Sequence, residues 1–142
     1  MTVIEVGVIV DGLPVYRVDY HKEVKGDPAL RSGLFAAIQS FAKEAFGDET
    51  EELRLKNLTI CMITINLKEG MDAVLFAVAD KATRSVDPIR SALKKIGKSI
   101  MESKERINTL QPDKNIFIRQ FIDDSFDELR MRPKDRARRL FG

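Results

Sequence analysis

The sequence predicts a single α+β domain in which helices cover one face of a five-stranded antiparallel sheet. The chain has 142 residues, a length at which one domain buries a hydrophobic core. Five short runs are β-branched or alternate apolar and polar residues, and most are joined by connections too short for a parallel crossover. Longer segments with helical spacing interrupt and follow these runs. The expected order is strand, strand, helix, strand, strand, strand, helix, helix, in two layers.

The first two strands are predicted to form a hairpin. Residues 2–10 (TVIEVGVIV) are mostly β-branched, and residues 14–20 (PVYRVDY) alternate again. Asp11-Gly12 lies between them, and the glycine supplies the positive φ that a tight turn needs. Gly7, inside the first run, indicates a bulge or a close approach of packed backbone. One face of the first strand is expected to carry Ile4, Val6, Val8 and Val10.

A helix is predicted to begin at Asp27-Pro28 and to end at Gly47. Asp accepts hydrogen bonds from free N–H groups at the N-cap, Pro fits the first helical position, and glycine is common just beyond a helix C-terminus. Between these limits apolar residues recur at helical spacing, and we expect them to face the core. They are Leu30, Leu34, Ala37, Ile38, Phe41 and Ala45.

Three further strands are predicted over residues 52–56, 58–67 and 71–79. The first (ELRLK) is short and places Leu53 and Leu55 on one face. The second (LTICMITINL) is longer and more apolar, and a Lys-Glu-Gly turn joins it to the third. The connections are too short for crossovers, so these strands form a meander.

Two helices are predicted to follow. One begins at Asp87-Pro88 and is broken by Gln-Pro-Asp at residues 111–113, and the other covers about residues 114–131. The domain therefore spans residues 1–131. The inward-facing residues are expected to be Ile89, Leu93, Ile96, Ile100 and Ile107 in one helix, and Ile118, Phe121, Ile122, Phe126 and Leu129 in the other.

Candidate catalytic and metal-binding residues are few. Cys61 is the one cysteine, which excludes an internal disulfide, and its apolar neighbours indicate a reduced core thiol. His21 is the one histidine, in a charged segment typical of a solvated loop, so neither a zinc site nor a Ser-His-Asp triad is indicated. The glycines are too far apart for a phosphate loop. We expect no enzyme activity, no metal and no cofactor.

Two acidic clusters are interpreted as solvated surface. Residues 47–52 (GDETEE) lack the alternating ligands and the central glycine of a calcium loop. The carboxylates of the last helix are expected to form its wet face and to pair weakly with the basic tail. These are Asp123, Asp124, Asp127 and Glu128.

The first predicted helix is apolar around most of its circumference. Phe35 and Phe46 lie outside its expected core stripe, and Gly33 and Ala36 lie nearby. A helix of this kind has a second surface to bury. Two alternatives are open: self-association, which we favour, and cover by the last helix of the same chain.

The net charge is +2, but the end of the chain is strongly basic. A basic tail over residues 132–142 is either solvated or in contact with an anionic membrane surface, and the acidic body disfavours nucleic acid. No apolar run reaches the length of a membrane span, and no signal peptide is seen. We therefore expect a cytoplasmic protein whose only association with a membrane is peripheral. The residues for an anionic contact are Arg130, Arg132, Lys134, Arg136, Arg138 and Arg139.

Three segments carry a resemblance to known families. The hairpin VGVIVDGLPVYRVDY, the helix LRSGLFAAIQSFAKEAFG and the strand DAVLFAVAD are similar to segments of longin and roadblock domains, both of the profilin-like (SNARE-like) group, and above all to the archaeal versions. The turn at residues 11–15 and helix residues 32–33 and 41–44 carry the match, which covers residues 3–105. Roadblock domains have a helix before the first strand, so the longin order is favoured.

The resemblance implies a non-catalytic interaction module. Such domains form homodimers or heterodimers with a related chain through the first helix and the neighbouring edge strand, and they scaffold or regulate small Ras-like GTPases or act in vesicle-trafficking complexes. A roadblock-type GTPase regulator and a small-molecule-sensing profilin-like domain are the alternatives. Carried onto this chain, the dimer or partner surface comprises Phe35, Gln39, Lys43, Phe46, Leu53 and Leu55.

Overall fold

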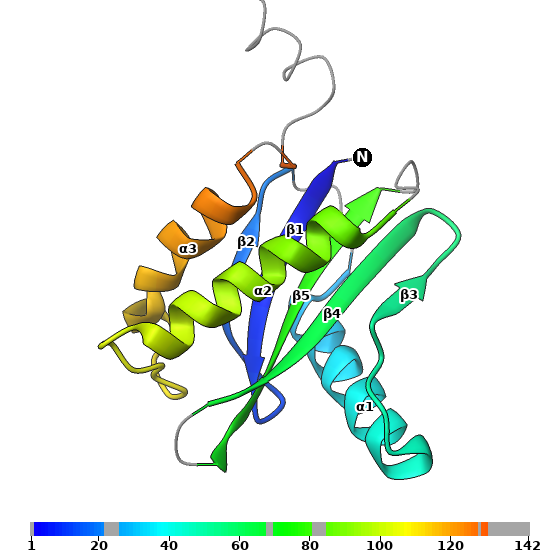
Figure 1. The fold of residues 1–142 in the computed structure, drawn as a ribbon, viewed down its shortest axis with the longest axis horizontal. Helices are drawn as coiled ribbons and strands as arrows, with labels where there is room; N and C mark the ends of the chain where they lie inside the picture. The colour runs from blue at the N-terminus through cyan, green and yellow to red at the C-terminus, as the bar shows by residue number, and fades with distance from the viewer. Residues whose placement is uncertain (1, 22–25, 68–69, 81–84, 128, 131–142) are drawn as a thin grey trace, which may run out of the picture.

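A computed structural model describes residues 2–21, 26–67, 70–80, 85–127 and 129–130. The strands form one antiparallel sheet in the order β2-β1-β5-β4-β3, which confirms the predicted α+β class (Figure 1). The elements are β1 (Val3–Val10), β2 (Leu13–Asp19), α1 (Pro28–Phe46), β3 (Glu52–Arg54), β4 (Leu58–Asn66), β5 (Asp72–Asp80), α2 (Asp87–Glu102), the 3-10 helix η2 (Pro112–Asn115) and α3 (Phe117–Ser125).

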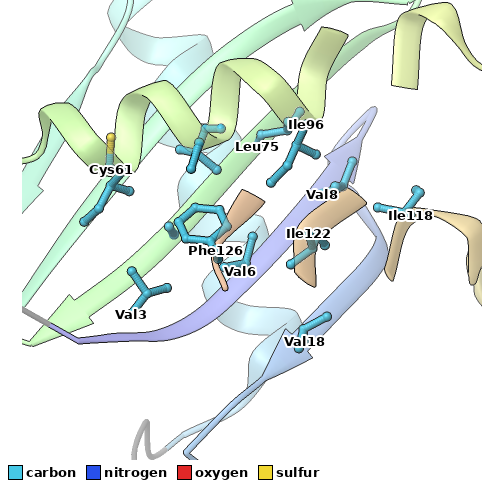
Figure 2. Packing of buried hydrophobic residues seen from close by; sticks show 14 of the residues in the cluster. Val3, Val6, Val8, Val18, Cys61, Leu75, Ile96, Ile118, Ile122 and Phe126 are labelled. Atoms are coloured by element: carbon cyan, nitrogen blue, oxygen red, sulfur yellow. The ribbon is translucent and has the colours of Figure 1, made fainter. Parts of the chain in front are cut away.

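The helices lie on both faces of the sheet, so the prediction of two layers with all helices on one face is wrong. Figure 1 shows α2 and α3 in front of the sheet and α1 on its far side. Each face has its own core. The core on the α1 side is built around Phe35 and Phe76. Figure 2 shows the core on the other side, which includes Leu75, Ile96 and Phe126. The reason is that β1 and β5 are apolar on both faces and buried along almost their whole length.

The hairpin turn between β1 and β2 has the predicted geometry. Asp11 has a φ of 50° and Gly12 a φ of 78°, which is the pair of positive angles found in a two-residue type I′ turn. Val10 pairs with Leu13 across it. β2 lies at the edge of the sheet. Pro14 has no backbone N–H to donate, and an edge strand tolerates this because its outer side makes no ladder bonds.

One residue of β1 faces the opposite way from the prediction. The ladder between β1 and β5 shifts register between Val3 and Glu5, and Ile4 in between packs into the core on the α1 side. A bulge adds a residue to one strand and so reverses the alternation of its side chains. The remaining members of the predicted set keep one face, toward α2 and α3: Val6, Val8 and Val10.

Gly7 makes room for an aromatic ring. A Cβ at this position would lie 2.4 Å from both Cε1 and Cζ of Phe76. The same ring packs against Phe35 of α1, with 4.9 Å between the ring centroids. Of the two interpretations of Gly7, the structure shows the close approach, and the register shifts of β1 lie on either side of it, between Val3 and Glu5 in the ladder with β5 and between Val8 and Ile9 in the ladder with β2.

The last two helices differ from the prediction in length. The predicted third helix is replaced by η2 followed by the shorter α3. Asn115 explains the interruption: its buried amide donates to the carbonyl oxygens of Val15 (2.9 Å) and Asn108 (2.8 Å), while its Oδ1 accepts from the Asn108 N–H (2.7 Å). These bonds fasten η2 to β2. The predicted inward residues Ile118, Ile122 and Phe126 are fully buried, as Figure 2 shows.

Candidate interaction surface on α1

An apolar stripe runs along the side of α1 that faces away from the sheet. Its large residues are exposed, with Leu30 at 73%, Phe41 at 68% and Leu34 at 54% of their full accessible surface. At 3.6 residues per turn, these residues and two exposed alanines fall in one line, opposite the buried side of the helix. We call this set the outer stripe: Leu30, Leu34, Ala37, Phe41 and Ala45.

The other side of α1 is anchored to the sheet by a charged and an aromatic contact. Arg31 Nη2 lies 2.9 Å from Oε2 of Glu5, whose carboxylate is fully buried in β1. Four residues further along α1, Phe35 packs on Phe76 of β5. Together these contacts set the rotation of the helix about its own axis, and with it the direction of the outer stripe.

A third anchor joins α1 to the segment before β3. The Gln39 side chain donates from Nε2 to the carbonyl oxygen of Thr50 (2.8 Å) and accepts at Oε1 from the Thr50 N–H (2.7 Å). The amide thus satisfies both backbone groups of one residue, much as a neighbouring strand does. This pairing fixes the path of the chain from the end of α1 into β3.

The residues predicted to form the dimer or partner surface fall into two groups. Phe35 is 3% exposed and Gln39 is 7% exposed, so both side chains belong to the interior and their assignment to a surface is corrected here. Leu53 packs in part against the core on the α1 side. The members that remain exposed are Lys43, Phe46 and Leu55.

The prediction for the core side of the first helix is wrong for five of its six residues, since Ile38 is partly buried and the others are exposed: Leu30, Leu34, Ala37, Phe41 and Ala45. Both sides of α1 carry apolar residues at helical spacing, so periodicity alone does not say which side meets the sheet. The alternative that the last helix covers α1 is also wrong, because α3 packs on the opposite face of the sheet (Figure 1). The self-association alternative stays a prediction.

The two residues first considered for catalysis or metal binding, Cys61 and His21, are buried and partly buried, respectively. Cys61 is buried, and burial raises the pKa of its thiol to about 11. His21 is partly buried and donates a hydrogen bond from Nε2 to the carbonyl oxygen of Arg130, so its interpretation as a solvated loop residue is corrected. Among the residues that the structure describes, no group of three or more His, Cys, Asp or Glu side chains is placed to hold a metal.

The carboxylates of α3 do not all form a solvated face, because Asp123 makes contacts within the protein. Tyr20 donates from its hydroxyl to Asp123 Oδ1 (2.6 Å), and Arg119 donates from Nε to Asp123 Oδ2 (2.9 Å). Burial, and next the bond to Asp123, raises the pKa of Tyr20 above its usual range. Asp124 accepts from Gln120 at the surface. The Asp123 contacts tie α3 to the end of β2, and Glu128 lies outside the described residues.

The basic tail over residues 132–142 lies outside the described residues. Arg130 is the one described residue of the predicted anionic contact; its guanidinium lies 5.3 Å from the centre of the Tyr20 ring and 3.3 Å from Asp127 Oδ1. None of the described helices has the length and apolar character needed to cross a bilayer. The remaining predicted anionic contacts are in the undescribed segment: Arg132, Lys134, Arg136, Arg138 and Arg139.

A small cavity of about 360 Å³ lies at the C-terminal end of α2. Apolar side chains, including Leu67, Met71 and Ile107, form part of its wall, and its charged side chains are exposed. A ligand-sensing site has polar groups that converge on the ligand. This cavity therefore gives little support to the alternative of a small-molecule-sensing domain.

The fold and the surface define a class of protein: an α+β domain with a five-stranded antiparallel sheet and an apolar helix face open to solvent. No protein-family model matches the chain, and no curated protein matches it either. Membership of the longin or roadblock family accordingly stays a prediction from the resemblance of the three segments.

Proposed function

We propose that this chain is a non-catalytic, longin-like interaction module that pairs with a second copy of itself through α1, and that the pair scaffolds or regulates a small Ras-like GTPase. The observation that carries the proposal is the outer stripe. Large apolar residues in a row on a helix face are typical of a surface that is buried in an assembly. Here they face away from the protein's own core.

Pairing through the outer stripe is supported by its length and its chemistry. α1 has 19 residues, which makes it about 28 Å long. Burying one large apolar side chain stabilises a contact by about 1.5–3 kcal/mol, and Leu30, Leu34 and Phe41 in two copies supply six such side chains. A two-fold axis lets the same stripe serve as both halves of the contact.

The edge of the sheet next to α1 supports the same arrangement. β3 is the edge strand, and Leu55 just beyond it is 51% exposed. Edge strands pair readily across a two-fold axis. With three residues β3 supplies few backbone bonds, so α1 supplies most of the contact. Lys43 and Phe46, in the last turn of α1, border it.

The GTPase partner rests on the resemblance of the hairpin, the first helix and the fifth strand to longin and roadblock domains. A role in a trafficking-type complex and a roadblock-type regulatory role follow from the same resemblance. The proposal therefore joins two separate supports, the outer stripe for the pairing and the resemblance for the partner.

A nucleotide-exchange assay tests the function. Small Ras-like GTPases from the same organism, loaded with a fluorescent GDP analogue, are mixed with the full chain, and binding, nucleotide release and GTP hydrolysis are followed. We expect binding or an altered rate with at least one of them. Phe41→Glu, in the outer stripe, should lose the effect, whereas Lys95→Glu, an exposed position on α2, should keep it. Absence of binding to every GTPase contradicts the proposed partner.

A further inference from the structure

The edge of β4 is open over its last residues. β3 pairs with β4 only from Thr59 to Cys61, and one more bond joins the Met62 N–H to the Glu51 carbonyl (3.0 Å). Backbone groups of an antiparallel strand alternate between its two sides, so Thr64 points its N–H and C=O the same way as Met62. Among the described residues neither group of Thr64 has a backbone partner. The edge is ready to pair with another strand.

A groove of about 600 Å³ runs along this open edge, on the α2 side of the sheet. Ile63 and Ile65 line it and are only partly buried. α2 comes close to the sheet at Gly97, where a Cβ would lie 3.1 Å from Cγ2 of Ile65. The groove therefore has an apolar floor on β4 and a wall formed by α2.

The groove lining carries both signs of charge, with the cations on α2 and the carboxylates of Glu49, Glu51 and Glu102 around them. Lys94 and Lys98 are one helical turn apart, exposed, and line the groove. Arg90, nearer β3, is already paired with Glu51 (3.4 Å) and Asp87 (3.1 Å). The Lys98 ammonium lies 4.0 Å from Glu102 in an exposed pair, which is a weak contact. Among the described residues, Lys94 is therefore the groove cation that forms no ion pair, and Lys98 forms only this weak one.

We propose that this groove binds an extended segment of a partner protein that carries apolar and acidic residues at every second position, and that the segment adds to the sheet beside residues 63–66 of β4. Its backbone bonds to Thr64, as in other cases of strand addition. Every second side chain faces α2, where an apolar one covers Ile63 and Ile65 and an acidic one reaches Lys94 or Lys98.

An extended segment fits this site better than a helix or a small molecule. The unmade bonds are backbone N–H and C=O groups in strand geometry, and another strand satisfies them with its own backbone. The site lies on the face of the sheet opposite α1, so it leaves the outer stripe free. The proposal therefore does not rest on the outer stripe or on the GTPase, and β3, at the same edge of the sheet, is the element that both proposed sites border.

Selection of short random peptides by display on the full-length protein tests the proposal, with affinities measured by fluorescence polarisation. The selected peptides should share apolar and acidic residues at every second position. Thr64→Pro removes an N–H that makes no bond within the sheet, and edge positions tolerate proline. It should weaken binding roughly five- to tenfold, the effect of one lost hydrogen bond. Thr64→Val keeps the N–H and should keep the affinity.

A second pair of variants tests the charge. Lys94→Glu combined with Lys98→Glu should weaken binding at least as much as Thr64→Pro, and Lys95→Glu, exposed on the same helix but outside the groove, should not. The proposal is overturned by a library that yields no binder, or by binders that are insensitive to both changes. Self-association of the chain that is lost in Thr64→Pro also overturns it, because the edge then belongs to a second copy.

Discussion

Arg31 of α1 and Glu5 of β1 form an ion pair in which the carboxylate is fully buried and the guanidinium is 16% exposed, with 2.9 Å between Nη2 and Oε2. The second carboxylate oxygen, Oε1, is buried without a hydrogen-bond partner among the described residues. Arg31 is the cation that the described part of the chain places against this buried charge, and the charge depends on it. The pair therefore ties the orientation of α1, and the outward direction of the outer stripe, to the stability of the domain.

Removal of the cation is predicted to destabilise the protein strongly. Arg31→Met should lower the free energy of unfolding by about 3–5 kcal/mol, because it leaves the Glu5 carboxylate buried and unpaired. Urea denaturation followed by circular dichroism measures the change. Combining it with Glu5→Gln should restore a large part of the loss, since no charge is then buried. A single variant as stable as the wild type would show that the pair does not anchor α1.

Replacement by alanine is predicted to destabilise the protein at Gly7 and to stabilise it at Gly33. Gly7→Ala places a Cβ 2.4 Å from the Phe76 ring and should destabilise by about 1–3 kcal/mol through overpacking. Gly33 lies in α1 with open space around it, so Gly33→Ala should stabilise by about 0.5–1 kcal/mol. Thermal unfolding of the two variants is the measurement. A Gly7→Ala protein that melts with or above the wild type contradicts the close approach.

The buried thiol of Cys61 is predicted to make stability depend on alkaline pH. Its pKa is raised from 9.0 to about 11 by burial, so the thiol form is favoured in the folded protein. Its contribution to stability is full below pH 9 and is lost as the pH rises through 11. The free energy of unfolding, measured by denaturation at pH 9 and at pH 11, should fall less between these two values for Cys61→Ala than for the wild type. Equal losses would mean that the thiol does not contribute.

The local signals of the sequence predicted most of the fold. The Asp11-Gly12 turn, the Asp27 cap and the Gly47 end of α1 all lie where their chemistry predicts, because each depends on a few adjacent residues. The bulge at Ile4 and the interruption of the last helix at Asn115 did not follow from local patterns. Both depend on contacts with residues far along the chain.

The sequence did not indicate which side of α1 faces solvent, and Phe35 and Gln39, predicted for the surface, are buried against the sheet. Phe35 lies on one side of α1 and the outer stripe on the other, so both sides of the helix carry apolar residues. The buried polar residues Glu5 and Gln39 show which side meets the sheet. Polar residues with buried partners are not recognisable before the partners are known. The open edge of β4 could not be foreseen either, because it depends on where β3 stops pairing.

Light scattering across a range of protein concentrations tests the pairing through the outer stripe most directly. The wild type and Lys95→Glu should approach twice the 16.1 kDa mass of one chain as the concentration rises. Phe41→Glu should stay at the mass of one chain with an unchanged circular dichroism spectrum, because a carboxylate in the contact has no partner there. A wild type that remains at 16.1 kDa at high concentration, or a Phe41→Glu variant that associates as strongly, contradicts the pairing.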